Sequence, residues 1–243
     1  MRVCVLDIES QELIRDWNKP WEGGLSVAGV WVSWTGGAMG EFRLYQRDEL
    51  EFLGDALGSA DVVVTKNGAR YDLPALDDFL KETPHGGMPP LKHHCDLQVL
   101  ATEALGYRVS LDNLAWATLR RGKDASGAMA PTLWKEGRYS ALHTYNMRDI
   151  ALTRDLFFFA RDYGYLLATT DAGDVRLPMS VPGGVDAWVA PLPSQNRRIN
   201  YEPATDRQIA AIQRLYGYEW RPTPGFTKVQ ASELIKSLKE VGR

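Results

Sequence analysis

The residues best suited to chemistry in this sequence are carboxylates in three separate segments. Asp7 and Glu9 end a short apolar stretch, and their spacing of two places both side chains on one face of a strand. Asp72 follows the segment NGARY and lies in the first turn of a helical pattern, while Asp149 lies four residues after Tyr145 in the segment YNMRD. Hard divalent cations bind oxygen ligands, so these carboxylates are candidates for a metal site.

Each motif taken alone has an ordinary structural explanation. With 31 acidic residues among 243, an acidic pair two residues apart is expected about four times by chance. The helix dipole favours an acid such as Asp72 in a first turn, and a tyrosine four residues before an aspartate commonly forms a local hydrogen bond on a helix. Asp7 and Glu9 are more informative, because two charges at the end of an apolar strand are costly unless a cation compensates them.

Three segments before residue 46 have strand patterns. Arg2–Leu6 is a short apolar strand, Leu25–Trp34 alternates and then becomes continuously apolar, and Glu41–Tyr45 alternates polar and apolar residues. Gly36 and Gly37 mark a turn between the second and third segments. The patterns predict an antiparallel meander.

The following segments alternate between helical and strand patterns. Asp61–Thr65 is a β-branched strand between helical patterns at Asp48–Leu57 and Tyr71–Lys81, which predicts a parallel β–α–β unit. Residues 121–137 are predicted to form a loop. Further helices are predicted at Asp96–Leu105, Ser110–Leu119 and Tyr139–Tyr163. The predicted fold class is α/β, with a mixed sheet that is antiparallel over its first three strands, then parallel, and flanked by helices.

The carboxyl-terminal part of the sequence is predicted to leave this main domain. Tyr165–Met179 has the pattern of a hairpin around Asp171–Gly173, so the main domain is placed at residues 1–180. Residues 181–204 are rich in proline and glycine and are predicted to be a linker. Residues 205–243 are predicted to be a small helical module, with amphipathic helices at Thr205–Tyr216 and Thr227–Leu238.

Composition and charge narrow the class of protein. The hydrophobic fraction of 44% and the charged fraction of 24% are those of a globular protein that folds by itself. The net charge of −3 lacks the basic excess typical of duplex-binding proteins, although bound cations would offset an acidic site. Apolar runs are too short to span a membrane and no secretion signal is recognisable, so a cytoplasmic protein without membrane contact is expected.

Other candidate ligands and aromatic residues are interpreted as structural. Cys4 and Cys95 are expected to be free buried thiols, because their spacing fits no disulfide framework. His93 and His94 precede Cys95, but further zinc ligands at suitable spacing are absent, so the two histidines are predicted to lie in a solvated loop. Phe157–Phe159 and the eight tryptophans are expected mainly in the core.

Taken together, the three acidic motifs resemble those of the DEDD exonucleases of the ribonuclease H-like superfamily. DIE supplies the first motif with Asp7 and Glu9, and NGARYD supplies the second with Asp72. YNMRD supplies the third with Asp149, together with Tyr145 as the tyrosine of the DEDDy branch. The second motif is most similar to the proofreading domains of family B DNA polymerases and their stand-alone relatives, and the resemblance covers residues 1 to about 165.

A sister branch of that family has a histidine five residues before the last aspartate. This chain has Thr144 at that position, and His143 is one residue too early, so the tyrosine branch is the one indicated. The segments SLDNLAWATL and TLWKEG also fit later helices of the family. The resemblance implies a 3′→5′ exonuclease that hydrolyses phosphodiester bonds at the 3′ end of single-stranded DNA and releases nucleoside 5′-monophosphates.

The resemblance also implies two divalent cations, Mg²⁺ or Mn²⁺, and a role for each motif residue. Asp7 is implied to bridge both ions, with Glu9 and Asp149 helping to hold the ion that activates water. Asp72 is implied to act on the other ion, and Tyr145 to orient the water. Two substrate contacts are expected as well, Asn67 and the base-stacking Tyr71.

Two alternative functions remain open. A ribonuclease of the same fold is one, because a metal site does not itself discriminate between sugars. A non-catalytic nucleic-acid-binding module is the other, although the presence of all four acids and the tyrosine disfavours it. The expected partner is single-stranded nucleic acid with a free 3′ end, DNA favoured over RNA, and protein partners stay unknown from the sequence.

The tail carries a second resemblance. ATDRQIAAIQRLYG followed by TKVQASELIKSLKE is similar to a small helical module appended to many bacteriophage proteins, which implies a phage-like origin. Its basic residues are explained equally by nucleic-acid contacts and by solvated helix faces. They are Arg207, Arg214, Lys228, Lys236 and Lys239.

Overall fold

The computed structural model describes residues 1–33, 39–122, 129–184, 205–216, 232 and 235. Contacts divide the chain into two units, Met1–Pro191 and Leu192–Arg243. All the residues predicted to form the acidic site belong to the first unit.

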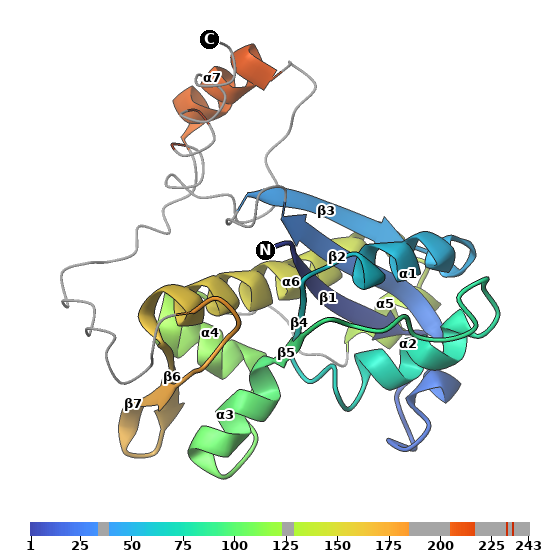
Figure 1. Ribbon diagram of the computed structural model, residues 1–243, viewed down its shortest axis with the longest axis horizontal. Coiled ribbons are helices and arrows are strands. Elements are labelled where there is room, and N and C mark those ends of the chain that lie inside the picture. The colour runs from blue at the N-terminus through green and yellow to red at the C-terminus, as the bar shows by residue number, and fades with distance from the viewer. Residues whose placement is uncertain (34–38, 123–128, 185–204, 217–231, 233–234, 236–243) are drawn as a thin grey trace. The chain divides into compact units, whose positions relative to one another are not determined.

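A five-stranded mixed sheet forms the centre of the first unit (Figure 1). β1 pairs antiparallel with β2 and β2 with β3, whereas β4 runs parallel to β1 and β5 parallel to β4. The predicted antiparallel-then-parallel sheet is therefore confirmed, while the predicted turn at Gly36 and Gly37 lies outside the described residues. The strand order is β3-β2-β1-β4-β5, with bounds β1 Val3–Ser10, β2 Leu25–Ser33, β3 Gly40–Tyr45, β4 Val62–Thr65 and β5 His94–Asp96.

The central strand β1 is longer than its apolar segment, which was predicted to end at Leu6. Backbone pairing with β2 continues through Asp7 opposite Gly29 and Glu9 opposite Val27. The ladder hydrogen bonds of a sheet join backbone groups, so two acidic side chains do not interrupt it. Asp7 consequently lies inside the paired part of the strand, and Glu9 is the last residue before the register shifts between Glu9 and Ser10.

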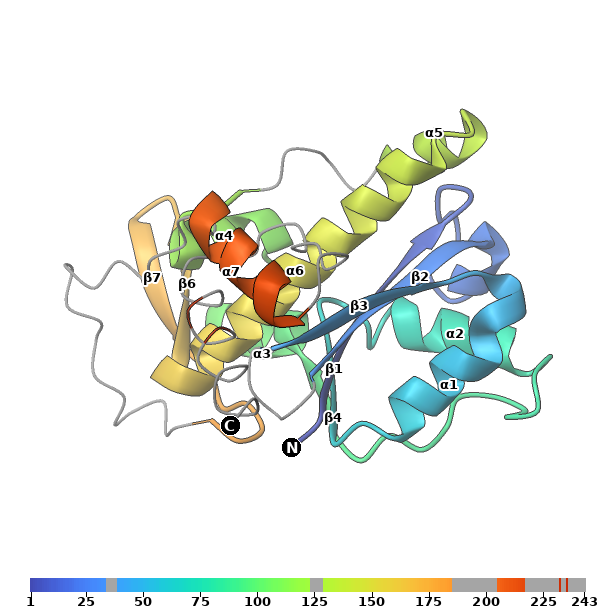
Figure 2. The same ribbon diagram turned by 90° about the horizontal axis from the view of Figure 1, so that it is seen from above.

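Helices cover both faces of the sheet (Figure 2). α1 Leu50–Gly58 and α2 Asp72–Leu80 pack on one face, and α5 Met129–Lys135 and α6 Tyr139–Tyr163 pack on the other. Every residue of β2 is buried, as expected for a strand covered on both sides.

The alternation of side chains along β1 sorts its residues between these two faces. Cys4, Leu6 and Ile8 belong to the core that contains α1 and α2. Because successive side chains of a strand point to opposite faces, Asp7 and Glu9 face the side covered by α6. α6 packs directly on β1 and β2, so it is the element that can bring a further carboxylate to them.

Two helices of the first unit, α3 and α4, begin directly after the residues that were predicted to cap them. The side chains of Asp96 and Ser110 accept hydrogen bonds from backbone N–H groups at the starts of α3 and α4. The predicted hairpin is confirmed, with Thr170 opposite Gly173 at its turn. The bounds are α3 Leu97–Leu105, α4 Leu111–Leu119, β6 Tyr165–Thr170 and β7 Gly173–Pro178, with short 3₁₀ helices at Pro20–Gly23 and Arg47–Glu49.

Two predictions about irregular segments are wrong in part. The predicted loop 121–137 contains α5, which forms because Ala130 and Leu133 are buried against Val27 and Leu142; residues 123–128 lie outside the described residues. His94 does not lie in a solvated loop but in β5, where its ring Nε2 is 2.8 Å from the Thr65 hydroxyl. Burial lowers the pKa of His94, so the ring is held in its neutral form more strongly than in water.

Both cysteines and the aromatic triplet are placed as expected. Cys4 and Cys95 are free and buried, and burial raises the pKa of each thiol to about 12. Phe157–Phe159 are buried in the core. Trp17 and Trp116, in contrast, are about half exposed, so the tryptophans are not all core residues.

The second unit contains one described helix, α7 Asp206–Tyr216, which agrees with the predicted helix at residues 205–216. The predicted helix Thr227–Leu238 lies outside the described residues except for Ser232 and Ile235, and so does most of the predicted linker. Across the described part of the chain, none of the helices combines the length and the apolar content needed to cross a membrane.

Candidate metal centre

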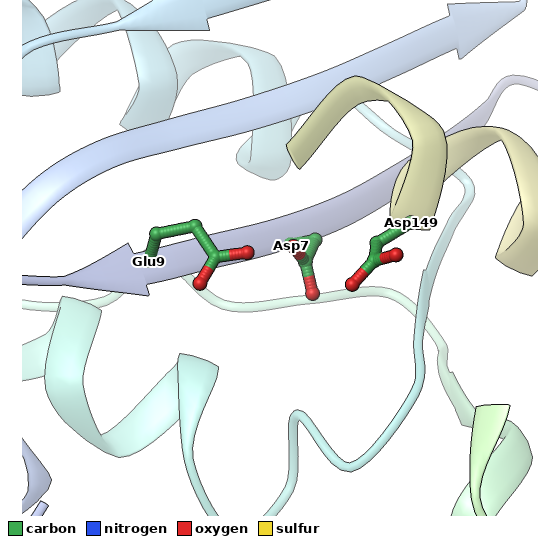
Figure 3. A group of neighbouring side chains, drawn as sticks. All are labelled: Asp7, Glu9 and Asp149. Atoms are coloured by element: carbon green, nitrogen blue, oxygen red, sulfur yellow. The ribbon is translucent and has the colours of Figure 1, made fainter. Parts of the chain in front are cut away.

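Three carboxylates from two elements converge on the α6 side of the sheet. Asp7 and Glu9 come from β1 and Asp149 from α6, and each offers one oxygen such that the three oxygens lie within 4.8 Å of one another (Figure 3). Asp149 is buried, with 5% of its surface exposed. Three negative charges at this separation repel one another in a region of reduced dielectric, and a hard cation with oxygen ligands would remove that repulsion. The donor set therefore fits a divalent cation.

A buried asparagine holds the first of these carboxylates. Asn146 has no exposed surface, and its Nδ2 donates to the Asp7 carboxylate Oδ2 at 2.8 Å and to the Asp7 backbone oxygen at 3.0 Å. Two bonds from one amide fix both the side chain and the backbone of Asp7. Asn146 was not among the predicted site residues, although it lies three positions before Asp149 and therefore on the same side of the helix.

The asparagine fits only because the facing position on β2 has no side chain. Gly29 lies opposite Asp7 in the β1–β2 ladder. A Cβ atom at Gly29 would lie 1.9 Å from Oδ1 of Asn146 and 2.5 Å from Cδ1 of Ile150. The Oδ1 atom is buried and has no hydrogen-bond partner in the described structure. The close packing of Asn146 on Gly29 therefore serves the Nδ2 atom, which donates to Asp7. Gly29 was also missed, since nothing in its local sequence marks it.

Asp72 is held by a different interaction. It is the first residue of α2, it is 3% exposed, and its Oδ1 accepts a hydrogen bond of 2.9 Å from the backbone N–H of Ile8. The pairing of β1 with β4 ends at Val5, so the N–H of Ile8 takes this carboxylate as its acceptor. Burial raises the pKa of Asp72 to about 7, and the nearby charge of Asp96 adds to the rise, while hydrogen bonds from Ile8 and from its own backbone oppose it.

The loop that delivers Asp72 is clamped by a second buried carboxylate. Asp96 accepts hydrogen bonds from the backbone N–H groups of Asn67 at 2.8 Å and Ala69 at 2.9 Å, in addition to its bond at the start of α3. Asn67 has φ +77°, in the left-handed region that asparagine tolerates better than most residues. The turn NGARYD thus has a defined shape because both its residue types and its hydrogen bonds select it.

Two tyrosines flank the carboxylates. Tyr145 is 7% exposed, and burial raises its pKa above the ordinary range, with the charges of Asp149, Glu9 and Asp7 adding to the effect. Its hydroxyl also forms a hydrogen bond with the Asp149 side chain. Tyr71 is partly buried, and burial followed by the charge of Asp72 raises its pKa too. Both phenols therefore stay protonated at neutral pH.

These groups line a cavity of about 400 Å³. Six of the seven predicted site residues are part of its lining, and the seventh, Asp72, is not. Tyr71 also meets the half-exposed Trp17 edge to face, with ring centroids 6.2 Å apart. The six are Asp7, Glu9, Asn67, Tyr71, Tyr145 and Asp149.

Comparison with known proteins agrees with this architecture. No curated protein matches the chain. A family model described as the RNase_H superfamily matches residues 4–157, a range that contains all of the converging carboxylates and the five-stranded sheet except for Val3. The match extends over more than half of the 243 residues, and the chain therefore belongs to the ribonuclease H superfamily.

Proposed function

We propose that this protein is a DEDDy-type 3′→5′ exonuclease that removes nucleotides from the 3′ end of single-stranded DNA and releases nucleoside 5′-monophosphates. Members of the ribonuclease H superfamily are generally nucleases that use divalent metals. The observation that carries the finer proposal is the convergence of Asp7, Glu9 and Asp149 within 4.8 Å, next to the hydroxyl of Tyr145.

Asp7, Glu9 and Asp149 would hold a divalent cation, Mg²⁺ or Mn²⁺, and Asp72 would contribute to a second. When bound, such a pair of ions polarises the phosphate, lowers the pKa of a bound water and stabilises the leaving oxygen. Asn146 keeps the carboxylate of Asp7 in one orientation, because its amide bonds both Oδ2 and the backbone oxygen of that residue. The side chains therefore hold an arrangement prepared before substrate arrives.

Tyr145 is proposed to orient the attacking water rather than to take its proton. The raised pKa keeps the phenol protonated, so at neutral pH it is a poor base. A protonated hydroxyl can still accept a hydrogen bond from water while its own bond with Asp149 fixes its direction. The result is positioning of the nucleophile near the carboxylates.

The size of the cavity supports action at an end of a strand. A volume of about 400 Å³ lies at the small end of ligand pockets, so it suits the end of a single strand better than a stretch of duplex. Asn67 and Tyr71, which line it, are proposed to contact that nucleotide, with Tyr71 as the aromatic partner of the base.

The central experiment compares labelled oligonucleotides. DNA and RNA single strands carrying the label at the 5′ or the 3′ end are incubated with Mg²⁺, with Mn²⁺ and with EDTA. We expect 5′-labelled DNA to shorten one nucleotide at a time and 3′-labelled DNA to release labelled mononucleotide at once, both only with metal. Faster degradation of RNA would assign the ribonuclease alternative, and cleavage of circular single strands or activity in EDTA would overturn the exonuclease.

The division into a catalytic domain at residues 1–180, a linker at 181–204 and a helical module at 205–243 remains a prediction. So does the cytoplasmic location. Because every motif residue precedes residue 150, a chain ending after Pro193 is expected to retain hydrolysis of short oligonucleotides. A folded but inactive truncated chain would show that the tail takes part in the chemistry.

A further inference from the structure

The cavity is lined by basic as well as acidic side chains. Lys66 and Arg108 belong to the same lining as Asp7, Glu9 and Asp149. The acids come from β1 and α6, whereas Lys66 directly follows β4 and Arg108 lies between α3 and α4. Neither basic residue belongs to the three acidic motifs, and the protein as a whole has a net charge of −3, so a general basic surface does not explain them.

Two neutral oxygen atoms help to hold Lys66 in the lining. Its Nζ donates to Oε1 of Gln98 at 2.6 Å and to the backbone oxygen of Val109 at 2.9 Å. Gln98 and Val109 are both buried, with 4% and 7% of their surfaces exposed. These two bonds fix the position of the ammonium group but do not themselves cancel its charge, because both acceptors are uncharged.

Arg108 is held by the loop of the second acidic motif. Its Nη2 donates to Oδ1 of Asn67 at 2.6 Å, and the backbone N–H of Asn67 is in turn bonded to the Asp96 carboxylate. Arg108 is exposed and forms no ion pair among the residues that the structure describes. A guanidinium offers five donors in a planar fork, so one bond to an amide oxygen leaves it able to bind an anion.

A polyanionic substrate accounts for cations at this place. A nucleic-acid strand whose scissile phosphate lies at the carboxylates carries further phosphates on neighbouring linkages, and these have no attraction to an acidic lining. Lysine binds phosphate as a point charge, and arginine binds it through paired donors. Two fixed cations beside the carboxylates would draw such a phosphate in and set the register of the strand.

We propose that Lys66 and Arg108 form a subsite for one non-scissile phosphate of the nucleic-acid strand. The subsite rests on the proposed function, since it takes the scissile phosphate to lie at Asp7, Glu9 and Asp149. It binds backbone charge and not base identity, so it contributes to affinity and register for every sequence alike.

The test places an uncharged methylphosphonate at each of the first four linkages upstream of the terminal one, a single linkage in each oligonucleotide. The rate of removal of the first 3′ nucleotide gives kcat/KM for the wild type, Lys66→Met, Arg108→Ala and the double variant. One modified linkage should lower the wild-type kcat/KM about tenfold, as expected for one lost charged contact. The double variant should show that loss already with unmodified DNA, mainly as a higher KM, and should be indifferent to the modification.

Salt provides a second readout. Each neutralised phosphate of a single strand contributes a slope of about −0.7 in log affinity against log salt. The double variant should therefore have a shallower slope by roughly that amount or more, which a merely structural defect would not produce. Arg120→Ala is the matched control, because Arg120 is an exposed arginine bonded to Asp174 at 2.8 Å and does not line the cavity.

The outcomes separate the two proposals. If the double variant loses activity equally on all modified and unmodified oligonucleotides and keeps the wild-type salt slope, the subsite is overturned while the exonuclease stands. Lys66→Arg and Arg108→Lys, which keep the charges, should recover most of the sensitivity to methylphosphonate. If the wild type hydrolyses no oligonucleotide at all, the proposed function fails and the subsite fails with it.

Discussion

Two kinds of carboxylate meet around β1, and different interactions hold them. Asp7, Glu9 and Asp149 lie together with their oxygens within 4.8 Å, on the side of the sheet covered by α6. Asp72 reaches β1 from α2 and accepts a backbone hydrogen bond from Ile8, the residue between Asp7 and Glu9. The first group brings like charges together, whereas the second satisfies a backbone group at the place where a neighbouring strand has ended.

The difference separates two reasons for an acid to be present. The packing of a helix on a sheet holds the three converging carboxylates in place, and a cation would turn their repulsion into binding. Asp72 is useful to the fold without any ion, because an unpaired buried N–H costs about as much as a lost hydrogen bond. Substitutions in the two groups should therefore differ in what they change.

The largest effect is expected for Asp149→Ala. Losing one of three converging ligands should reduce turnover of a 5′-labelled oligonucleotide to the level of the EDTA control and weaken Mn²⁺ binding, which electron paramagnetic resonance measures. Asp162→Ala is a matched control, since Asp162 is an exposed carboxylate on the same helix paired with Arg161. Measurable turnover in the Asp149 variant with unchanged Mn²⁺ affinity would remove that residue from the site.

A smaller effect is expected for Tyr145→Phe. The change removes one hydroxyl and leaves every carboxylate, so Mn²⁺ affinity should stay the same while the single-turnover rate falls roughly 10²-fold, as for positioned groups in general. Full activity with the cleavage step shown to be rate-limiting would exclude a role for the hydroxyl.

Asn146 and Gly29 should act as one unit. Asn146→Ala frees the Asp7 carboxylate and should lower Mn²⁺ affinity and activity about tenfold, the lower end for groups that orient metal ligands. Gly29→Ala should do the same, because the new Cβ would lie 1.9 Å from Oδ1 of Asn146. In the double variant the two losses should be less than multiplicative, since the closest clash is gone and only the contact of 2.5 Å with Cδ1 of Ile150 remains. Fully additive losses would show that Gly29 acts on the fold elsewhere.

The pH dependence of stability should isolate Asp72. Its pKa is about 7 in the folded protein against 3.8 ordinarily, so between these values the folded state binds the proton more tightly than the unfolded state does. In EDTA, the free energy of unfolding from urea titrations should therefore fall as pH rises from 4 to 7 and then level off. Asp72→Asn keeps an oxygen for Ile8 and should remove that part of the decline. An unchanged slope in the variant would mean that Asp72 is charged in the folded state at lower pH.

The positions of side chains were predicted best from the sequence where the short repeat of a strand or a helix fixes their geometry. The spacing of Asp7 and Glu9 gives their common face, and the helix period places Tyr145 beside Asp149. Secondary structure was predicted less well where it depends on contacts between residues that are distant in the sequence. α5 forms in a segment of loop-like composition because Ala130 and Leu133 find a buried surface, and β5 has only three residues, too few to show a period.

The same limit applies inside the candidate site. That Asp72 lies near the other acids was predicted only through the resemblance, and its bond to Ile8 depends on where β4 stops pairing with β1. Gly29 looks like any glycine in a strand until the register sets it opposite Asp7. Lys66 and Arg108 are far apart in sequence and meet at one cavity only when the two loops are folded.

The carboxylate of Asp96 links two segments that would otherwise move separately. It caps α3 and bonds the backbone of Asn67 and Ala69, so one buried side chain orders the loop that carries Asn67 to the cavity. The conformational entropy of this loop is therefore lost when the protein folds. A ligand that contacts Asn67 meets a backbone already in its final shape, and less of its binding free energy is spent on ordering the protein.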